Sequence, residues 1–130
     1  YVYVWKKNPI ASKSSVSLQE LEKYPCLTFD QGKTNSFYFA EEVFSTYEYK
    51  QTIQVDDRAS MLNLMVGLNG YTLCSGIICE ELNGSDYAAV PLKETEVMTI
   101  GYVKRKSIQL SELAQLYVNE LAKYKNLVLK

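Results

Sequence analysis

Short runs of apolar residues, some alternating with polar positions, predict the β-strands of this chain. Residues 1–5 combine valine with aromatic side chains, and residues 50–55 alternate Thr52 and Gln54 with Ile53 and Val55. β-Branched and aromatic residues favour strands, and a period of two places one set of side chains on one face. We therefore expect strands at residues 1–5, 26–29, 50–55, 71–75, 87–92 and 97–103.

Apolar residues spaced three and four apart predict helices between these strands. Ser17 and Glu20 have the spacing of a capping box, and Val16 is placed as its staple residue. Either Asp56 or Asp57 is suited to cap a later helix. The expected helices are residues 16–24, 36–47, 58–68, one or two turns within 76–84, and a last helix from about Ser111.

Two of the expected helices have well-defined apolar faces. The face of residues 58–68 comprises Met61, Leu64, Met65 and Leu68, and that of the last helix comprises Leu110, Leu113, Tyr117, Leu121 and Tyr124. The pair Asn69–Gly70 predicts a left-handed helix end, and residues 8–15 are expected to be a loop. Short strands that alternate with helices of about ten residues predict an α/β fold with a mainly parallel sheet flanked by helices.

Composition and charge exclude several classes of function. The chain has 130 residues, 14 Lys plus Arg against 15 Asp plus Glu, and a net charge of −1. This balance argues against direct nucleic-acid binding. No apolar run approaches the roughly 20 residues that cross a bilayer. The chain contains no histidine, so the commonest general base and the commonest metal ligand are missing.

The three cysteines, Cys26, Cys74 and Cys79, lie in apolar stretches without a CxxC spacing. We interpret them as small buried side chains in a reducing compartment rather than as a disulfide framework, with a reactive thiol as the alternative. We expect no metal and no cofactor. The chain starts at Tyr1 inside a predicted strand, which indicates a piece of a longer protein.

The segment from residue 29 to residue 39, FDQGKTNSFYF, joins a predicted strand to a predicted helix. One reading is a turn, in which the hydroxyl and carboxamide side chains only cap the helix. The other is an anion site, in which free helix amides, hydroxyls and a lysine bind a carboxylate, sulfate or phosphate group. Its candidate residues are Gln31, Gly32, Lys33, Thr34, Asn35 and Ser36.

Arg58 is electrostatically misplaced, because a cation in the first turn of a helix opposes the helix dipole. A salt bridge to Asp56, Asp57 or another surface acid is one explanation. The alternative is that Arg58 faces a cleft and pairs with an anionic ligand.

Four motifs, in their order along the chain, resemble the effector-binding domain of LysR-type transcriptional regulators. NPIASKSSVSLQELEKYPCLTF is similar to their His-Pro-Leu-Ala tetrapeptide with the helix and strand that follow. MLNLMVGLNGYTLCSG resembles their helix ending in Gly-Leu-Gly and its next strand. YAAVPL is similar to their L-x-x-V-P-L, and IGYVKRKSIQLSELAQLYVNEL resembles their returning strand and last helix. TFDQGKTNS is most similar to a loop of the regulators of sulfur assimilation, which contacts small anions there.

The chain departs from the family pattern at three places. Asn8 stands where the family usually has histidine, and an extra residue, Asn69 or its neighbour, interrupts the Gly-Leu-Gly. Cys74–Ser75 replaces the residues that usually lead to a proline. These departures bear on the ligand more than on the fold.

The resemblance implies a two-lobed fold of the type II periplasmic-binding-protein kind, with the effector in the cleft between the lobes. Residues 1–7 would be one crossover strand, 8–94 the second lobe, and 95–130 the returning crossover strand with the C-terminal helix of the first lobe. The implied function is ligand sensing without catalysis: a small anionic metabolite controls DNA binding by a missing helix-turn-helix domain. A cytoplasmic dimer or tetramer without membrane contact is implied for the parent protein.

Two rival functions stay open at this point. A lobe of a transporter solute-binding protein shares the same fold but needs an export signal or lipid anchor. A small enzyme that uses one of the cysteines is the other rival.

Overall fold

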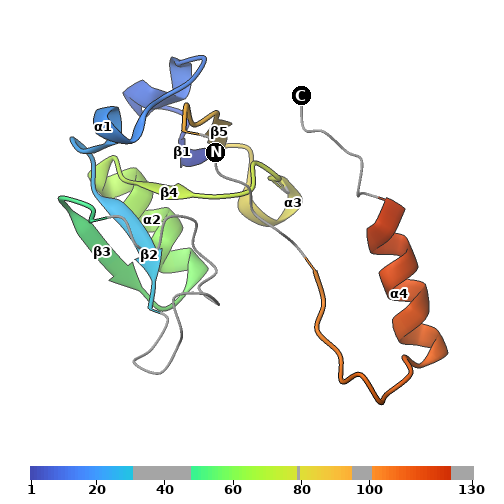
Figure 1. Cartoon of the computed structure of the whole chain (residues 1–130). Coiled ribbons are helices and arrows are strands. Elements are labelled where there is room, and N and C mark those ends of the chain that lie inside the picture. The colour runs from blue at the N-terminus through green and yellow to red at the C-terminus, as the bar shows by residue number, and fades with distance from the viewer. Residues whose placement is uncertain (31–47, 79, 95–100, 124–130) are drawn as a thin grey trace. The chain divides into compact units, whose positions relative to one another are not determined.

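Five of the six predicted strands form one mixed β-sheet (Figure 1). The computed structural model describes residues 1–30, 48–78, 80–94 and 101–123. These fall into two compact units, Tyr1–Met98 and Thr99–Lys130. The strands are β1 (Val2–Trp5), β2 (Cys26–Phe29), β3 (Thr52–Val55), β4 (Tyr71–Leu73) and β5 (Tyr87–Val90), in the spatial order β3-β2-β4-β1-β5.

The sheet is mixed because one central strand runs against the others. β2 is parallel to β3 and to β4, whereas β1 is antiparallel to both β4 and β5. Four strands therefore point in one direction, and the carboxyl ends of β2, β3, β4 and β5 share one edge of the sheet. The sheet was predicted to be mainly parallel. Four of its five strands do run in the same direction, and β1 is the exception.

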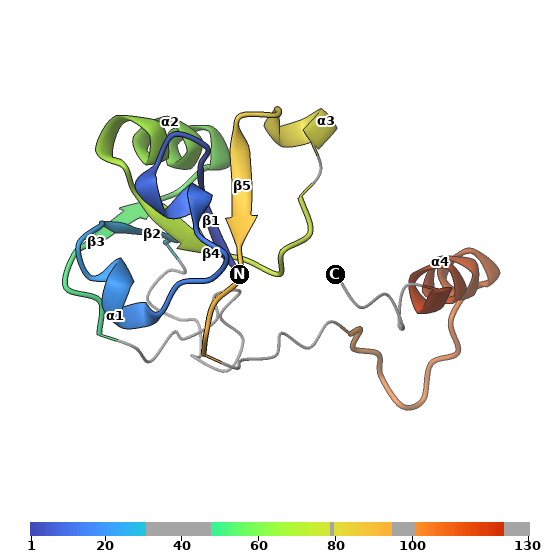
Figure 2. The same ribbon diagram turned by 90° about the horizontal axis from the view of Figure 1, so that it is seen from above.

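Helices cover both faces of this sheet (Figures 1 and 2). They are the 3₁₀-helix η1 (Pro9–Ser12) and the α-helices α1 (Leu18–Leu21), α2 (Arg58–Leu68) and α3 (Glu80–Asn83). The period-two pattern of β1 divides its side chains between the faces. Val2 and Val4 pack with Ile10 and Leu21 from η1 and α1, and Tyr3 belongs to the opposite cluster with residues of α2. Alternation in YVYVW thus separates the two cores.

Helix α2 begins and ends where the sequence predicts. Asp57 is its N-cap, and its carboxylate accepts a hydrogen bond of 2.8 Å from the Ser60 amide. Asn69 ends the helix in the left-handed region, with φ of 53°. Met61 and Met65 are buried, but Leu68 of the predicted face is 48% exposed. Periodicity identified the inner side of the helix but not how far along its length the sheet covers it.

Residues 8–15 were expected to be a loop, and this expectation is wrong for their first half, which forms η1. Asn8 caps η1: its Oδ1 accepts a hydrogen bond of 2.9 Å from the Ile10 amide. The other end of the same carboxamide, Nδ2, donates to the Asn69 carbonyl at 2.8 Å. Asn8 is only 2% exposed, so one buried side chain joins the start of η1 to the end of α2.

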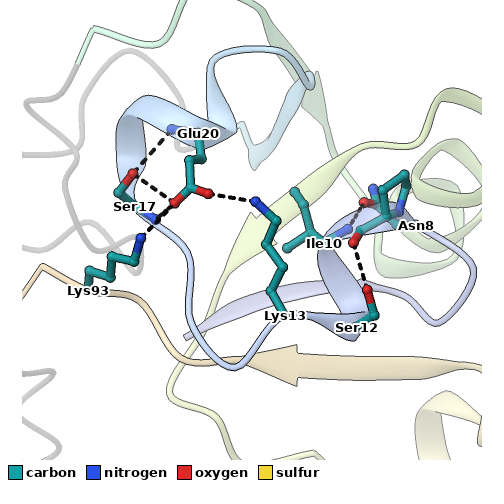
Figure 3. A network of polar contacts seen from close by, with 8 residues as sticks. Asn8, Ile10, Ser12, Lys13, Ser17, Glu20 and Lys93 are labelled. Atoms are coloured by element: carbon teal, nitrogen blue, oxygen red, sulfur yellow. Dashed lines mark hydrogen bonds and ion pairs between the residues drawn. The ribbon is translucent and has the colours of Figure 1, made fainter.

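A polar network around Glu20 fixes α1 against the segment that follows β5 (Figure 3). The predicted capping box is present, because the Ser17 hydroxyl accepts from the Glu20 amide and the Glu20 carboxylate accepts from the Ser17 amide. Lys13 and Lys93 both form ion pairs with this carboxylate. The Val16 amide donates to the Pro91 carbonyl at 2.9 Å, which brings residues 91–93 beside the start of α1.

These contacts predict a pH-dependent contribution of Glu20 to stability. The hydrogen bond from Lys13, and after it those from Ser17 and Lys93, hold the pKa of Glu20 well below its ordinary value of 4.5. A carboxyl with a lowered pKa in the folded state contributes stability above its unfolded pKa and loses that contribution as the pH falls. We expect the difference in unfolding free energy between wild type and Glu20→Gln to be constant above about pH 5 and to shrink steadily below it.

Urea unfolding of both proteins between pH 7 and pH 3 measures this difference. Glu22→Gln is a suitable control, since Glu22 is paired with a single lysine, Lys50. A Glu20 difference that keeps its full size down to pH 3 would contradict the assignment.

The second unit contains helix α4 (Glu112–Lys123), which confirms the helix expected near Ser111. The Ser111 hydroxyl accepts from the Ala114 amide at 3.3 Å and so caps it. Its apolar side chains Leu113, Tyr117 and Leu121 are exposed, and Tyr124 lies outside the described residues.

The sixth predicted strand, residues 97–103, is absent from residues 101–103, the part of this range that the structure describes. Residues 101–103 are exposed and form no strand, and 97–100 lie outside the described residues. A strand needs a neighbouring backbone to bond with, and no strand of the described ranges pairs with residues 101–103.

Candidate functional site

A pocket of about 210 Å³ lies within the first unit, at the carboxyl ends of β2 and β4 and the start of α2. In α/β sheets this edge is where ligands usually bind. The described residues that line the pocket come from β1, from these three elements, and from the segment between β4 and the end of α3. They are Tyr3, Phe29, Arg58, Met61, Leu62, Thr72, Leu73, Cys74, Ser75, Ile77, Ile78 and Asn83.

Arg58 is the only charged residue among the described residues that line this pocket. It is the first residue of α2, directly after the cap Asp57, and its side chain is exposed. Within the described ranges no acid forms an ion pair with Arg58, so the salt-bridge explanation of its position is not supported. The Asp57 carboxylate accepts from the Ser60 amide, and hydrogen bonds from the Ser60 side chain and then from its amide lower the pKa of Asp57. Within the described residues the guanidinium therefore has no ion-pair partner that would compete with an anionic ligand.

Tyr3 lines the same pocket and has a buried hydroxyl. The residue is only 5% exposed, and its hydroxyl has no hydrogen-bond partner within the described part of the chain. Its ring stacks on Tyr87, with centroids 5.4 Å apart. Burial, and to a lesser extent the neighbouring Tyr87, raises the pKa of Tyr3 above its ordinary value of 10. The hydroxyl thus keeps its proton at neutral pH and can donate a hydrogen bond.

The sequence did not identify Tyr3 as a site residue. YVYVW was interpreted only as a strand. The hydroxyl of a tyrosine between two valines, Val2 and Val4, is the feature that could have identified Tyr3. Both valines are fully buried on the opposite face. A tyrosine buried on a strand needs a partner for its hydroxyl, and none is obvious among the apolar residues nearby in the sequence.

Cys74 is the cysteine among the described residues that line the pocket, and its thiol is partly buried. The Cys74 Sγ accepts a hydrogen bond of 3.3 Å from the Gly76 amide, and burial raises the pKa of its thiol above 9.0. Cysteine reactivity depends on the thiolate, which is scarce at neutral pH when the pKa is raised. Cys26 is buried in the core with 2% exposure, and Cys79 lies outside the described residues.

The six residues of the predicted anion loop, Gln31, Gly32, Lys33, Thr34, Asn35 and Ser36, lie outside the described residues. The expected helix over 36–47 lies outside them too. The last described residues before this segment are Phe29, which lines the pocket, and Asp30, whose amide donates to the Val55 carbonyl at 2.8 Å. The chain thus enters the segment at the sheet edge where Arg58 lies.

The described residues also bear on metal binding and on membrane insertion. No group of three or more Cys, Asp or Glu side chains in the described ranges is placed to hold a metal ion. None of the described helices has both the length and the apolar character needed to cross a membrane.

The family model of the LysR substrate binding domain matches residues 1–125. No curated protein and no solved structure gives a significant match.

Proposed function

The chain belongs to the family of LysR substrate binding domains, and from this premise we propose that it senses a small anionic metabolite. The family has the type II periplasmic-binding-protein fold and a regulatory, ligand-sensing role. No reaction is proposed for the chain. The observation that carries the anionic preference is Arg58, a cation without an ion-pair partner in the described ranges, at a pocket on the ligand-binding edge of the sheet.

Arg58 suits an anion for two physical reasons. A guanidinium offers parallel N–H groups that match both oxygens of a carboxylate or two oxygens of a phosphate. Its place in the first turn of α2 costs stability against the helix dipole, and a bound anion would offset this cost. We propose that Gln31, Gly32, Lys33, Thr34, Asn35 and Ser36 add hydroxyl, carboxamide and backbone donors from the same edge.

The proposal extends to the parent protein. Residues 8–94 would form one lobe, residues 1–7 and the returning segment after 94 would be crossovers, and α4 would belong to the other lobe. The metabolite would lie in the cleft between the lobes and change their closure. The parent would be a cytoplasmic dimer or tetramer. A helix-turn-helix domain elsewhere in it would change its binding to DNA when the lobes close.

Thermal unfolding of the 130-residue chain with a panel of small anions at constant ionic strength tests the anionic preference. The panel includes sulfate, phosphate and organic carboxylates. A ligand that binds the folded state at 100 times its Kd stabilises it by about 2.7 kcal/mol. We expect at least one anion to raise the Tm of wild type and of the control Arg105→Gln but not of Arg58→Gln.

Arg105 is exposed and is not among the described residues that line the pocket, so its replacement is the matched loss of one positive charge. A panel in which no anion raises the Tm, or in which Arg58→Gln responds as wild type does, would contradict the proposal. A longer chain with both lobes should bind the same anion more tightly, and equal affinity would contradict a shared cleft.

A further inference from the structure

We propose that Ser75 is a second ligand contact, whose hydroxyl donates a hydrogen bond to the anion held by Arg58. This inference rests on the proposed function and names a residue that meets the anion from another strand. Cys74–Ser75 is one of the places where the chain departs from the family pattern. The contact would therefore be a feature of this chain rather than of that pattern.

The order of the strands places Arg58 and Ser75 on two sides of one strand end. β2 lies between β3 and β4, and both are parallel to it (Figure 1). Arg58 follows β3 by three residues, and Ser75 follows β4 by two. Neighbouring strands are about 4.8 Å apart, so β3 and β4 are separated by about 10 Å. An anion above the end of β2 is thus within reach of a long guanidinium side chain and of a hydroxyl.

Arg58 and Ser75 line the same pocket of about 210 Å³. An apolar cavity of about 150 Å³ holds one benzene molecule, so this pocket has room for a single small ligand. A ligand that fills it therefore meets both side chains.

The hydroxyl of Ser75 is an accessible donor. Its Oγ accepts a hydrogen bond of 3.3 Å from the Ile77 amide, and this contact is exposed. The residue makes no other hydrogen bond within the described part of the chain. A serine hydroxyl has one donor and two acceptor positions. The bond from Ile77 therefore orients the oxygen and leaves its proton available to a ligand.

The other donors near the end of β4 are less suited to a ligand. The Gly76 amide donates to the Cys74 sulfur at 3.3 Å, as the Ile77 amide does to Ser75. The Tyr3 hydroxyl is enclosed, and Thr72 lies inside β4 rather than beyond its end. Ser75 is thus the donor that this strand end presents at the edge of the sheet.

An oxyanion needs donors on more than one side. Each oxygen of a carboxylate, sulfate or phosphate accepts more than one hydrogen bond, and a guanidinium satisfies only the side that faces it. A hydroxyl on another side replaces part of the water that the anion loses on binding. The contact serves anions of one or of two charges alike.

Three variants of Ser75 separate ligand contact from a role in the turn to Ile77. Ser75→Ala removes both the donor and the acceptor, and Ser75→Thr keeps both. Ser75→Asp keeps an acceptor for the Ile77 amide but has no donor and adds a negative charge. A serine that only closes the turn would be replaced by aspartate without loss of anion binding.

Calorimetric titration of the 130-residue chain with sulfate, phosphate and acetate at constant ionic strength tests the contact. For an anion that binds through Arg58, Ser75→Ala should weaken binding about tenfold, since a hydrogen bond to a charged group is lost. Ser75→Asp should abolish binding, and Ser75→Thr should retain most of it. The ligand-free Tm of all three variants should stay close to that of wild type, because the altered contact is exposed.

Ser12→Ala is the matched control. It removes an exposed serine hydroxyl that also makes one local hydrogen bond, to the Pro9 carbonyl at 3.2 Å. Ser12 is not among the described residues that line the pocket. This variant should bind the anion as wild type does.

The outcomes distinguish this inference from the proposed function. Binding that depends on Arg58 but is equal in wild type and Ser75→Ala overturns the inference and leaves the anion sensor standing. Weaker binding in Ser75→Ala that Ser75→Asp restores assigns the residue to the turn and overturns the inference as well. Failure of every anion to bind contradicts both proposals.

Discussion

Replacing Gly70 with alanine should lower the unfolding free energy by about 1–3 kcal/mol, because it overpacks the core. A Cβ at this buried position would overlap the Leu27 Cδ1 and lie 3.2 Å from the Pro25 carbonyl oxygen. Neither group can move easily. Leu27 is fully buried, and the Pro25 oxygen accepts a hydrogen bond of 3.0 Å from the Tyr71 amide at the start of β4.

Gly67 provides the matched control three residues earlier. It lies inside α2, and a Cβ there would have no atom within 4 Å. Alanine is favoured over glycine in a helix by about 0.5–1 kcal/mol, so Gly67→Ala should stabilise the chain. Urea unfolding measures both variants. A Gly70→Ala protein as stable as wild type would show that the packing of α2 and β4 against β2 is looser than described.

Replacing Asn8 with alanine should also cost about 1–3 kcal/mol, the penalty of leaving buried polar groups unpaired. The Ile10 amide would lose its acceptor and the Asn69 carbonyl would lose its donor. Asn8 and Ile10 are at most 2% exposed, so water cannot easily replace the bond to the Ile10 amide. Because Asn69 has a left-handed backbone, loss of this bond also loosens the end of α2.

Two variants sharpen the test of Asn8. Asn8→Asp keeps an acceptor for the Ile10 amide but sets an oxygen against the Asn69 carbonyl, so it should be destabilised at neutral pH. Asn63→Ala removes an exposed asparagine of α2 and should change stability by less than about 0.5 kcal/mol. Equal unfolding free energies of Asn8→Ala and Asn63→Ala in urea would refute the role of Asn8.

The elements that local chemistry determines could be predicted from the sequence. The capping box of Ser17 and Glu20, the cap Asp57 and the helix end at Asn69 are each a matter of a few neighbouring residues. The α/β class followed from the order of such elements and the family from the resemblance of four motifs, and the family match confirms both. The direction of β1 did not follow, because strand direction in a sheet depends on connections rather than on the pattern of side chains.

Gly70 shows how a correct local prediction can miss a tertiary role. The pair Asn69–Gly70 predicted a left-handed helix end, and Asn69 alone takes that conformation. Glycine is required at position 70 for the close approach of Leu27 and Pro25, which are more than 40 residues away in the sequence. Distant contacts of this kind have no periodic signal.

The candidate site could be predicted only in part for the same reason. Arg58 was identified by its electrostatic misplacement in a helix, which is a local property. Tyr3 became a site residue through the register of β1, which places it opposite Thr72 of β4 and beside α2. Gln31, Gly32, Lys33, Thr34, Asn35 and Ser36 remain a prediction.

The central claim is that an anionic ligand binds at the carboxyl edge of the sheet beside Arg58. Amide chemical-shift mapping of the ¹⁵N-labelled chain, titrated with the anion of the panel that raises its Tm most, tests it most directly. We predict saturable shifts concentrated at residues 58–62 and 72–78, absent in Arg58→Gln. Saturable shifts confined to η1, α1 or α4, or shifts that persist unchanged in Arg58→Gln, would contradict the account.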